Sequence, residues 1–296
     1  MQKVQNPQSK KSDALDIGLF DGIFTAYQSQ KAIGLGGDNI GEQPKFIHWH
    51  KGEYRPVTVF TDNCLSDVLK APKGTRRIAW LLEPRGLREN AYNQFHELQR
   101  EHHCFDWLIT HDLPTTMLYP NAVWSPLGGA WVRKNDAPHK TKMVSMMTTD
   151  KKSTTGHQLR TQLQAYFTEH KTGIDMFGRG SVPIQSKSSA LESYRFSVVV
   201  ESCQSPGHFT EKLIDAFLSR TIPIYWGAPD IYRYFDPGGM IICNSADEII
   251  KAVNNLSADF YEEKHINVLR NMIRSDFMRC TEDYAVLKYP WIFEYE

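Results

Sequence analysis

The pattern that decides the fold lies in residues Tyr194–Asp236, which read YRFSVVVESCQSPGHFTEKLIDAFLSRTIPIYWGAPDIYRYFD. The apolar, β-branched run at residues 196–200 is typical of a strand that is covered on both faces, as in a parallel sheet. Small and polar residues with the turn pair Pro206-Gly207 then end that strand. Thr210 is a suitable N-cap for a helix that runs to about residue 220, and residues 221–226 suit a second strand. The segment is therefore predicted to form a βαβ unit.

The loop that leads into this helix has the chemistry of a phosphate site. A helix N-terminus offers unpaired backbone N–H groups and the positive end of the helix dipole, and Lys212 adds a cation within one turn of it. Glu211 would repel a phosphate, so its natural partner is a donor such as a sugar or ribose hydroxyl. In an α/β protein, this combination at the carboxyl end of a strand predicts a nucleotide-sugar site.

The segment resembles the donor-binding motif of the α1,3/α1,4-fucosyltransferases, glycosyltransferase family 10. The family pattern reads roughly F-x-x-x-F-E-N, a short loop, Y-x-T-E-K, a helix and I-P-I/V-x-x-G. The residues that match in register are Phe196, Glu201, Thr210-Glu211-Lys212 and Ile222-Pro223-Ile224-Tyr225-Trp226-Gly227. The chain departs from the pattern at Ser202, where the family usually has Asn, and at His208-Phe209, where it usually has Tyr and a small apolar residue. An ordered match of about forty residues is far more specific than an isolated Thr-Glu-Lys triplet.

The resemblance implies an α/β fold of the GT-B type, in which two Rossmann-like domains face each other across a cleft. It implies an acceptor-binding domain over residues 1–135 and a nucleotide-sugar-binding domain over residues 136–296. The charged stretch WVRKNDAPHKT at residues 131–141 lacks apolar periodicity and marks the expected linker. In such enzymes the last helix often returns to the first domain, and residues 291–293 are the candidates for this contact.

Further matches assign the donor-binding residues. The segments MVSMM at 143–147 and GHQLR at 156–160 resemble the first strand and helix of the family's donor domain, where the family places a phosphate-binding arginine. Arg160 matches that position best, the alternative being a solvated surface arginine. The resemblance therefore implies donor contacts from Arg160, Ser202, His208, Thr210, Glu211 and Lys212.

A candidate base lies at the end of the expected strand in Arg77–Pro84, which is similar to a family strand that ends in Gly-Glu. Inverting sugar transfer needs a base that takes the acceptor proton while the nucleoside diphosphate leaves from the opposite face. Glu83 is the best candidate, and Asp106 and Asp112 are the alternatives. Glu201 is the second predicted catalytic residue, since it could stabilise positive charge on the sugar ring or hold a sugar hydroxyl. Its other interpretation is a carboxylate that ties down the loop through backbone N–H groups.

These residues predict an inverting glycosyltransferase that moves L-fucose from GDP-fucose to a hydroxyl of a glycan. Arg160, Lys212 and the turn before Thr210 would stabilise the leaving diphosphate. The departures at Ser202 and His208 leave another GDP- or UDP-sugar open as the donor. A nucleotide-sugar-binding protein without turnover is the alternative from a different functional class.

No metal or other cofactor is expected. The chain has no D-x-D triplet, the usual device by which metal-dependent glycosyltransferases hold a divalent ion against the diphosphate, and cationic side chains are available in its place. His48-Trp49-His50 and His102-His103 lack carboxylate or cysteine company at ligand spacing, so we interpret them as structural or acceptor-side residues. The glycine-rich residues 34–37 lack full G-x-G-x-x-G spacing and are interpreted as a turn.

Composition agrees with this prediction. A chain of 296 residues that is 41% hydrophobic and 23% charged is long enough for two α/β domains and ordinary for a globular enzyme. The formal net charge of zero gives no support to a nucleic-acid or anionic-membrane partner. No apolar run suits a membrane span, and the first thirteen residues lack the apolar core of a secretory signal. Five widely spaced cysteines without a C-x-x-C motif fit a reducing compartment, so we expect a cytoplasmic protein.

Overall fold

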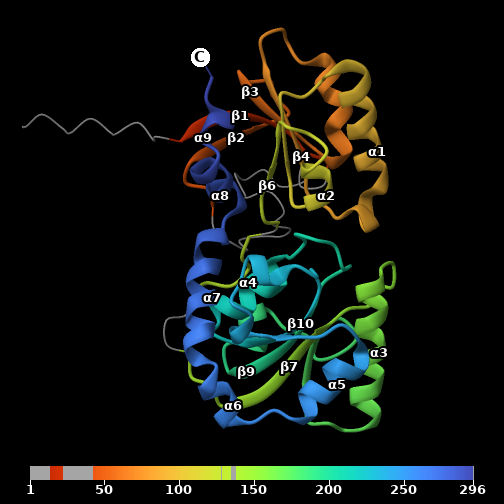
Figure 1. Cartoon of the computed structure of the whole chain (residues 1–296), viewed down its shortest axis with the longest axis vertical. Coiled ribbons are helices and arrows are strands. Elements are labelled where there is room, and N and C mark those ends of the chain that lie inside the picture. Colours follow the sequence, from red (N-terminus) through yellow and green to blue (C-terminus); the bar gives the residue numbers. More distant parts are fainter. Residues whose placement is uncertain (1–13, 23–42, 128, 135–137, 296) are drawn as a thin grey trace, which may run out of the picture.

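The structure is a computed structural model that describes residues 14–22, 43–127, 129–134 and 138–295. The glycine-rich residues 34–37 and the first thirteen residues lie outside the described residues. The chain forms two α/β domains, one above the other along the long axis, and each domain is built on a parallel sheet (Figure 1). Within the described residues, no helix has the length and apolar character that a membrane span needs.

The first domain contains a six-stranded sheet in the order β2-β1-β3-β4-β5-β6, and every pairing in it is parallel. Its strands are β1 (Leu15–Phe20), β2 (Ile47–Lys51), β3 (Val57–Thr61), β4 (Arg76–Leu81), β5 (Trp107–Thr110) and β6 (Ala122–Trp124). Its helices are the 3-10 helix η1 (Asp62–Lys70), α1 (Arg85–His102) and the short α2 (Leu113–Thr116). Side chains of η1 and α1 form one hydrophobic core with one face of this sheet.

The second domain contains a five-stranded parallel sheet in the order β11-β10-β9-β7-β8. Its strands are β7 (Lys142–Thr148), β8 (Asp175–Gly178), β9 (Tyr194–Val200), β10 (Ile222–Trp226) and β11 (Ile241–Ile242). Its helices are α3 (Thr155–Glu169), η2 (Lys187–Ala190), α4 (Glu211–Leu218), η3 (Ile231–Arg233), η4 (Pro237–Gly239), α5 (Ala246–Asn254), α6 (Ala258–Glu263) and α7 (His265–Met278). The expected βαβ unit is confirmed as β9-α4-β10.

The strand β9 is buried at six of its seven positions because both faces of the second sheet are covered. Phe196, Val198 and Val200 point into a core that α3 and α5 complete. Val199, between them, points into a second core formed with α4. The carboxyl end of β9 is thereby fixed from both sides.

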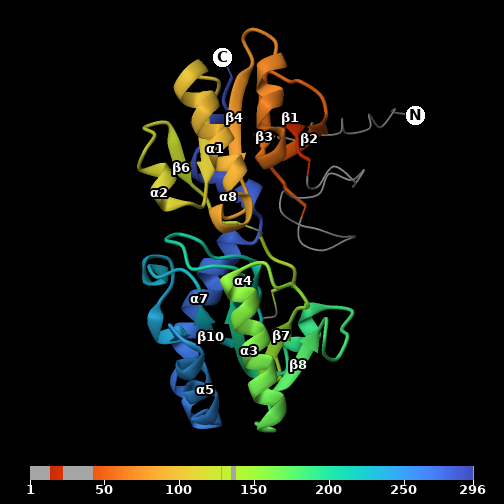
Figure 2. The ribbon, with the colours of Figure 1, turned by 90° about the vertical axis from the view of Figure 1, so that its right-hand side faces the viewer.

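The end of the chain returns to the first domain. The helices α8 (Thr281–Lys288) and α9 (Pro290–Phe293) follow α7 but lie against the first sheet (Figures 1 and 2). Ala285, Ile292 and Phe293 join a core that includes Trp80 of β4. Arg76 Nη1 also donates a hydrogen bond of 2.6 Å to the carbonyl oxygen of Trp291. These two helices therefore complete the face of the first sheet that η1 and α1 leave uncovered.

The chain crosses between the domains at two adjacent places. The first crossing runs between β6 and β7, and the second runs from α7 to α8. The two are joined by a hydrogen bond of 2.8 Å from the Ala130 N–H group to the Arg279 carbonyl oxygen. A Cβ atom at Gly129 would lie 2.8 Å from that same oxygen, and the φ of +59° there also favours glycine.

The docking of α9 gives a stability prediction. Phe293 is 2% exposed in the first core, whereas its neighbour Trp291 is 47% exposed. We expect Phe293→Ala to lower the free energy of urea-induced unfolding by about 3–5 kcal/mol, because it leaves a cavity where the large ring was. Trp291→Ala is the matched control and should cost less than about 1 kcal/mol. Equal losses in the two variants would contradict this docking.

Candidate active site

A buried carboxylate organises the loop between β9 and α4. Glu201 is fully buried, and its Oε1 accepts a hydrogen bond of 2.9 Å from the Thr210 N–H group. Its Oε2 accepts a bond of 2.8 Å from the Thr210 hydroxyl. Thr210 is also the N-cap of α4, as expected. Because both oxygens of Glu201 are used inside the protein, the arrangement favours the role of tying down the loop over direct contact with a sugar.

The N-terminus of α3 packs directly on this loop. Gly156 donates its N–H group to the Ser202 carbonyl oxygen at 3.0 Å. A Cβ atom at Gly156 would lie only 1.8 Å from the Glu201 carbonyl oxygen, so this approach requires glycine. One turn further along α3, Arg160 is almost fully buried and its Nε donates to the Gly156 carbonyl oxygen. The contact brings the predicted arginine beside the predicted donor loop.

Lys212 and Glu211 form the charged centre of the site. Lys212 Nζ lies 3.4 Å from both Glu201 Oε2 and Glu211 Oε1, and it donates to the Thr210 hydroxyl at 2.9 Å. Burial opposes the charge of Lys212, but the two carboxylates outweigh it and raise the lysine's pKa. Burial likewise opposes ionisation of Glu211, but Lys212 and Lys187 outweigh it and hold the pKa of Glu211 below its ordinary value. Both side chains are therefore charged at neutral pH.

Lys187 belongs to the same network although the sequence did not single it out. Its Nζ lies 3.3 Å from Glu211 Oε1 and 3.0 Å from the buried Asp215 Oδ2. The ammonium group also lies 4.1 Å from the centre of the Trp131 ring, a cation–π distance. Asp215 Oδ1 accepts from the N–H groups of Trp131 and Val132. The stretch expected to be a linker is thus bound to α4 and forms part of the site.

Two cavities meet at this network. The first, of about 410 Å³, lies within the second domain and is lined by Met147, Thr148, Arg179, Lys187 and Val198–Val200. The second, of about 510 Å³, is lined by residues of both domains, including Glu83, Leu87, Ser153, His157, Ser202, His208 and Thr210. The residues common to both walls are Trp131, Thr149, Lys151, Arg160, Glu211 and Lys212. All six predicted donor-binding residues line at least one cavity, whereas Glu201 lines neither.

Glu83 enters the larger cavity from the end of β4. Its backbone N–H group donates to the buried Asp62 Oδ2 at 3.1 Å, and its carbonyl oxygen accepts from the Tyr92 hydroxyl at 3.1 Å. Burial raises the pKa of Asp62 to about 7 and also raises the pKa of Glu83. The charge of Lys212 acts against that second shift. A carboxylate with a raised pKa is the better proton acceptor, as a catalytic base requires.

The two alternative bases are occupied elsewhere. Asp106 precedes β5, whereas Glu83 follows the parallel strand β4, so the two side chains lie at opposite ends of the sheet. The Asp106 carboxylate accepts hydrogen bonds from the N–H group and the guanidinium of Arg77. Asp112 is the N-cap of α2 and accepts from the backbone and hydroxyl of Thr115. Neither side chain lines the two cavities. Of these three carboxylates, only Glu83 therefore lines one of the two cavities.

A buried histidine pair joins the domains behind the loop. His208 Nδ1 lies 3.3 Å from His111 Nδ1 of the first domain, and His208 Nε2 lies 3.4 Å from the Ser202 hydroxyl. Both histidines are almost completely buried. Burial, with Lys212 nearby, lowers the pKa of His208 to about 3, and burial beside His208 lowers the pKa of His111 to about 3. The predicted donor residue His208 is therefore neutral and also an interdomain contact.

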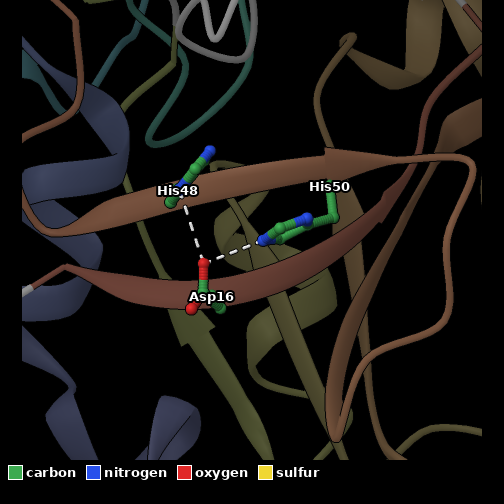
Figure 3. Close-up of side chains that lie close together, drawn as sticks. All are labelled: Asp16, His48 and His50. Atoms are coloured by element: carbon green, nitrogen blue, oxygen red, sulfur yellow. Dashed lines mark hydrogen bonds and ion pairs between the residues drawn. The ribbon is translucent and has the colours of Figure 1, made fainter.

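The structure adds a carboxylate to one of the two histidine pairs. Among the described residues, a single group of three potential ligands places its atoms within 4.8 Å of one another, and it consists of Asp16, His48 and His50 (Figure 3). The sequence indicated that His48 and His50 have no carboxylate at ligand distance. Parallel pairing of β1 with β2 supplies one, because Asp16 and His48 are register partners. None of the three lines either cavity.

Comparison with known proteins agrees with the predicted family. Residues 137–271 match the model of the C-terminal domain of glycosyltransferase family 10 (fucosyltransferase). A segment of 90 residues is 32% identical to the α-(1,3)-fucosyltransferase FucT of Helicobacter pylori, and it covers 30% of this chain and 18% of that protein. A segment of 73 residues is 32% identical to a putative fucosyltransferase of Acanthamoeba polyphaga mimivirus, covering 25% of this chain and 10% of that protein. The resemblance to family 10 is confirmed, although the matched segments span less than a fifth of these two relatives.

The fold also matches solved structures. An α1,3-fucosyltransferase crystallised with GDP aligns with a TM-score of 0.53 at 15% identity, covering 99% of this chain and 96% of that one. A mutant of S. aureus TarM in complex with UDP aligns with a TM-score of 0.54 at 12% identity, covering 81% of this chain and 56% of that one. The prediction of a GT-B-type fold with two parallel-sheet domains is confirmed.

The buried histidine pair gives a pH prediction. His208 has a pKa of about 3 in the folded protein and an ordinary value near 6.5, so below pH 6.5 the unfolded chain binds a proton that the folded protein does not. Its contribution to stability is thus fully present above pH 6.5 and is lost as the pH falls toward 3. We expect His208→Gln to reduce the slope of the unfolding free energy against pH by up to about 1.4 kcal/mol per unit between pH 6 and pH 4. Equal slopes in parent and variant, measured by urea unfolding, would show that His208 titrates in the folded state.

Proposed function

We propose that this chain is an inverting glycosyltransferase that transfers L-fucose from GDP-fucose to a hydroxyl group of a glycan. The observation that carries the proposal is the family 10 match over residues 137–271, which includes Arg160 and the complete loop from Glu201 to Lys212. One relative, with a matched segment of 90 residues, is described as an α-(1,3)-fucosyltransferase. The two joined cavities supply space for a donor and an acceptor at the same residues.

The shape of the site supports one orientation of the donor. The smaller cavity combines Met147, Val198–Val200 and the Trp131 ring with several cations, which suits a nucleoside and its phosphates. Arg160 and Lys212 stand in the wall common to both cavities, where a diphosphate would pass from one to the other. The sugar then lies in the larger cavity with Ser202, His208 and Glu83. Glu211, fixed by two lysines, is the acceptor for a hydroxyl hydrogen bond.

The chemistry follows from this placement. The Glu83 carboxylate takes the proton of the acceptor hydroxyl while the acceptor oxygen forms its bond to the anomeric carbon. The bond from that carbon to the β-phosphate oxygen breaks on the opposite face, and the nucleoside diphosphate leaves with the bonding electrons. Arg160, Lys212 and the N-terminus of α4 stabilise the negative charge that develops. These groups supply the charge that a metal ion would, so we propose no metal for this step.

Glu201 contributes by positioning. Its bonds to Thr210 fix the first turn of α4, and its charge together with that of Glu211 keeps the Lys212 ammonium group protonated. We therefore propose that Glu201 is a positioning residue and that Glu83 alone of the two predicted catalytic carboxylates contacts the reacting atoms.

Two alternatives rest on specific residues. Ser202 and His208 depart from the family pattern and line the cavity proposed for the sugar, which favours a test of other GDP- and UDP-sugars as donors. A protein that binds the donor without turnover would keep the Lys212 network and have an unreactive Glu83.

The five cysteines are all unpaired, which supports a reducing compartment such as the cytoplasm.

The role of Glu83 can be tested by Glu83→Gln, which keeps the size of the side chain and removes its basicity. We expect the rate of GDP release with acceptor present to fall by about 10²- to 10⁴-fold, with GDP-fucose binding nearly unchanged in calorimetry. Asp106→Asn is the matched control, because Asp106 lies outside both cavities, and it should retain the parent rate. Loss of turnover in Asp106→Asn but not in Glu83→Gln would reverse the assignment.

The donor site can be tested by Lys212→Ala. We expect GDP and GDP-fucose to bind at least about 10-fold more weakly in calorimetry without added metal, because the variant removes a charge at the proposed diphosphate position. Lys142→Ala is the control, since Lys142 pairs with Asp175 at 3.3 Å in the same domain but lines neither cavity. A thermal unfolding scan checks that the Lys212 variant is folded. Preference for a UDP-sugar would keep the site and change the donor, and unchanged GDP binding in Lys212→Ala would contradict the site.

A further inference from the structure

The first sheet carries a cluster of metal-ligating side chains on its outward edge. His48 and His50 are two residues apart on the edge strand β2, so they project from the same face. Asp16 projects beside them from β1, where it is the register partner of His48 (Figure 3). The set of two imidazoles and one carboxylate is thus assembled by the parallel pairing of two strands.

The ligand atoms already have nearly the spacing that a metal ion needs. His50 Nε2 lies 2.8 Å and His48 Nδ1 lies 3.4 Å from the same oxygen, Asp16 Oδ1. Nitrogen and oxygen ligands about 2.0–2.1 Å from a tetrahedral Zn²⁺ ion stand roughly 3.3 Å apart. The three ligand atoms all lie within 4.8 Å of one another, so an ion among them would require the most widely separated pair to move closer by at most about 1.5 Å.

The cluster is open to ions from solution. The side chains of Asp16, His48 and His50 are 66%, 44% and 20% exposed. Three protein ligands on one open face would leave the remaining position of the ion to water.

We propose that Asp16, His48 and His50 form a binding site for a divalent transition-metal ion, with Zn²⁺ as the expected occupant, that joins β1 to β2. Imidazole nitrogens suit Zn²⁺, Co²⁺ and Ni²⁺, whereas Mg²⁺ and Ca²⁺ prefer oxygen ligands, of which this cluster has one carboxylate. The inference is independent of the proposed sugar transfer, because none of the three side chains lines the two cavities.

Two further side chains set the strength of the site. Arg55 Nη2 lies 2.8 Å from His50 Nδ1 and 2.7 Å from Glu53 Oε2. A metal on His50 Nε2 requires a proton on Nδ1, and an arginine cannot accept that proton in a hydrogen bond. Glu53 Oε2, 3.9 Å from Nδ1, is the group that can accept it once Arg55 turns away. Arg55 therefore opposes metal binding to His50, whereas Glu53 favours it by accepting the Nδ1 proton in a hydrogen bond.

The consequence of binding is structural. Asp16 and His48 are adjacent in space but thirty-two positions apart in the chain, from 16 to 48. A link between them closes that long connection, which is where metal clips contribute most to stability. In the order of the described strands, β2 is also an edge strand of the first sheet. An ion here would fix the register of this edge.

The test uses the full chain, treated with a chelator and then titrated with ZnCl₂ in calorimetry and thermal unfolding. We expect one tight site per chain in the parent protein and a rise of at least about 2 °C in the unfolding midpoint. His48→Ala and Asp16→Asn should each weaken Zn²⁺ binding by at least about 10-fold and abolish the rise. Arg55→Gln should strengthen binding.

The control is His102→Ala. His102 is 58% exposed and lies 3.9 Å from Glu101, so it also pairs an exposed imidazole with a carboxylate, but no third ligand is found beside it among the described residues. This variant should bind Zn²⁺ as the parent does. X-ray absorption of the zinc-loaded parent should show nitrogen and oxygen ligands without sulfur.

Three results would overturn the proposal: Zn²⁺ binding that is unchanged in His48→Ala and Asp16→Asn, sulfur in the metal's ligand shell, or absence of a saturable site in the parent. Sugar transfer is read out separately, by GDP release without added metal. Failure of the metal site would therefore leave the proposed function standing, and failure of transfer would leave the metal site standing.

Discussion

The site depends on the burial of one carboxylate. Glu201 has no contact with water, so each of its oxygens must accept hydrogen bonds within the protein, and Thr210 supplies two of them. This pair fixes the beginning of α4, and the helix in turn fixes Lys212. The negative charge at the centre also makes a buried cation possible beside it. A neutral group of the same shape at position 201 would keep the loop but remove one of the two carboxylates that stabilise the charge of Lys212.

The parts of the fold that local patterns encode were predictable. The strand β9, the N-cap at Thr210 and the strand β10 follow from hydrophobic runs and turn residues in one continuous segment. The base candidate Glu83 could also be found, because it directly follows an apolar strand. Asp106 could have been set aside by the same rule, since it precedes its strand and parallel strands present their carboxyl ends to ligands.

The parts that depend on pairing between distant segments were not predictable. Lys187 reaches Asp215 from a 3-10 helix 28 positions earlier, and His208 meets His111 across the domain boundary. Asp16 reaches His48 through a strand register that no local pattern specifies. In each case the residues are ordinary by themselves, and their chemistry depends on the neighbours that tertiary packing supplies.

The double crossing between the domains has a mechanical consequence. A single connection between two domains would restrain their relative orientation at one point only. Here the chain crosses twice, and the two crossing segments are held side by side by the hydrogen bond from the Ala130 N–H group to the Arg279 carbonyl oxygen. The two crossings together therefore restrain the position of the first domain relative to the second. The larger cavity is lined by both domains, so its shape depends on this restrained arrangement. The position of Glu83 opposite the loop from Glu201 to Lys212 thus depends on how the domains are joined as well as on how each one folds.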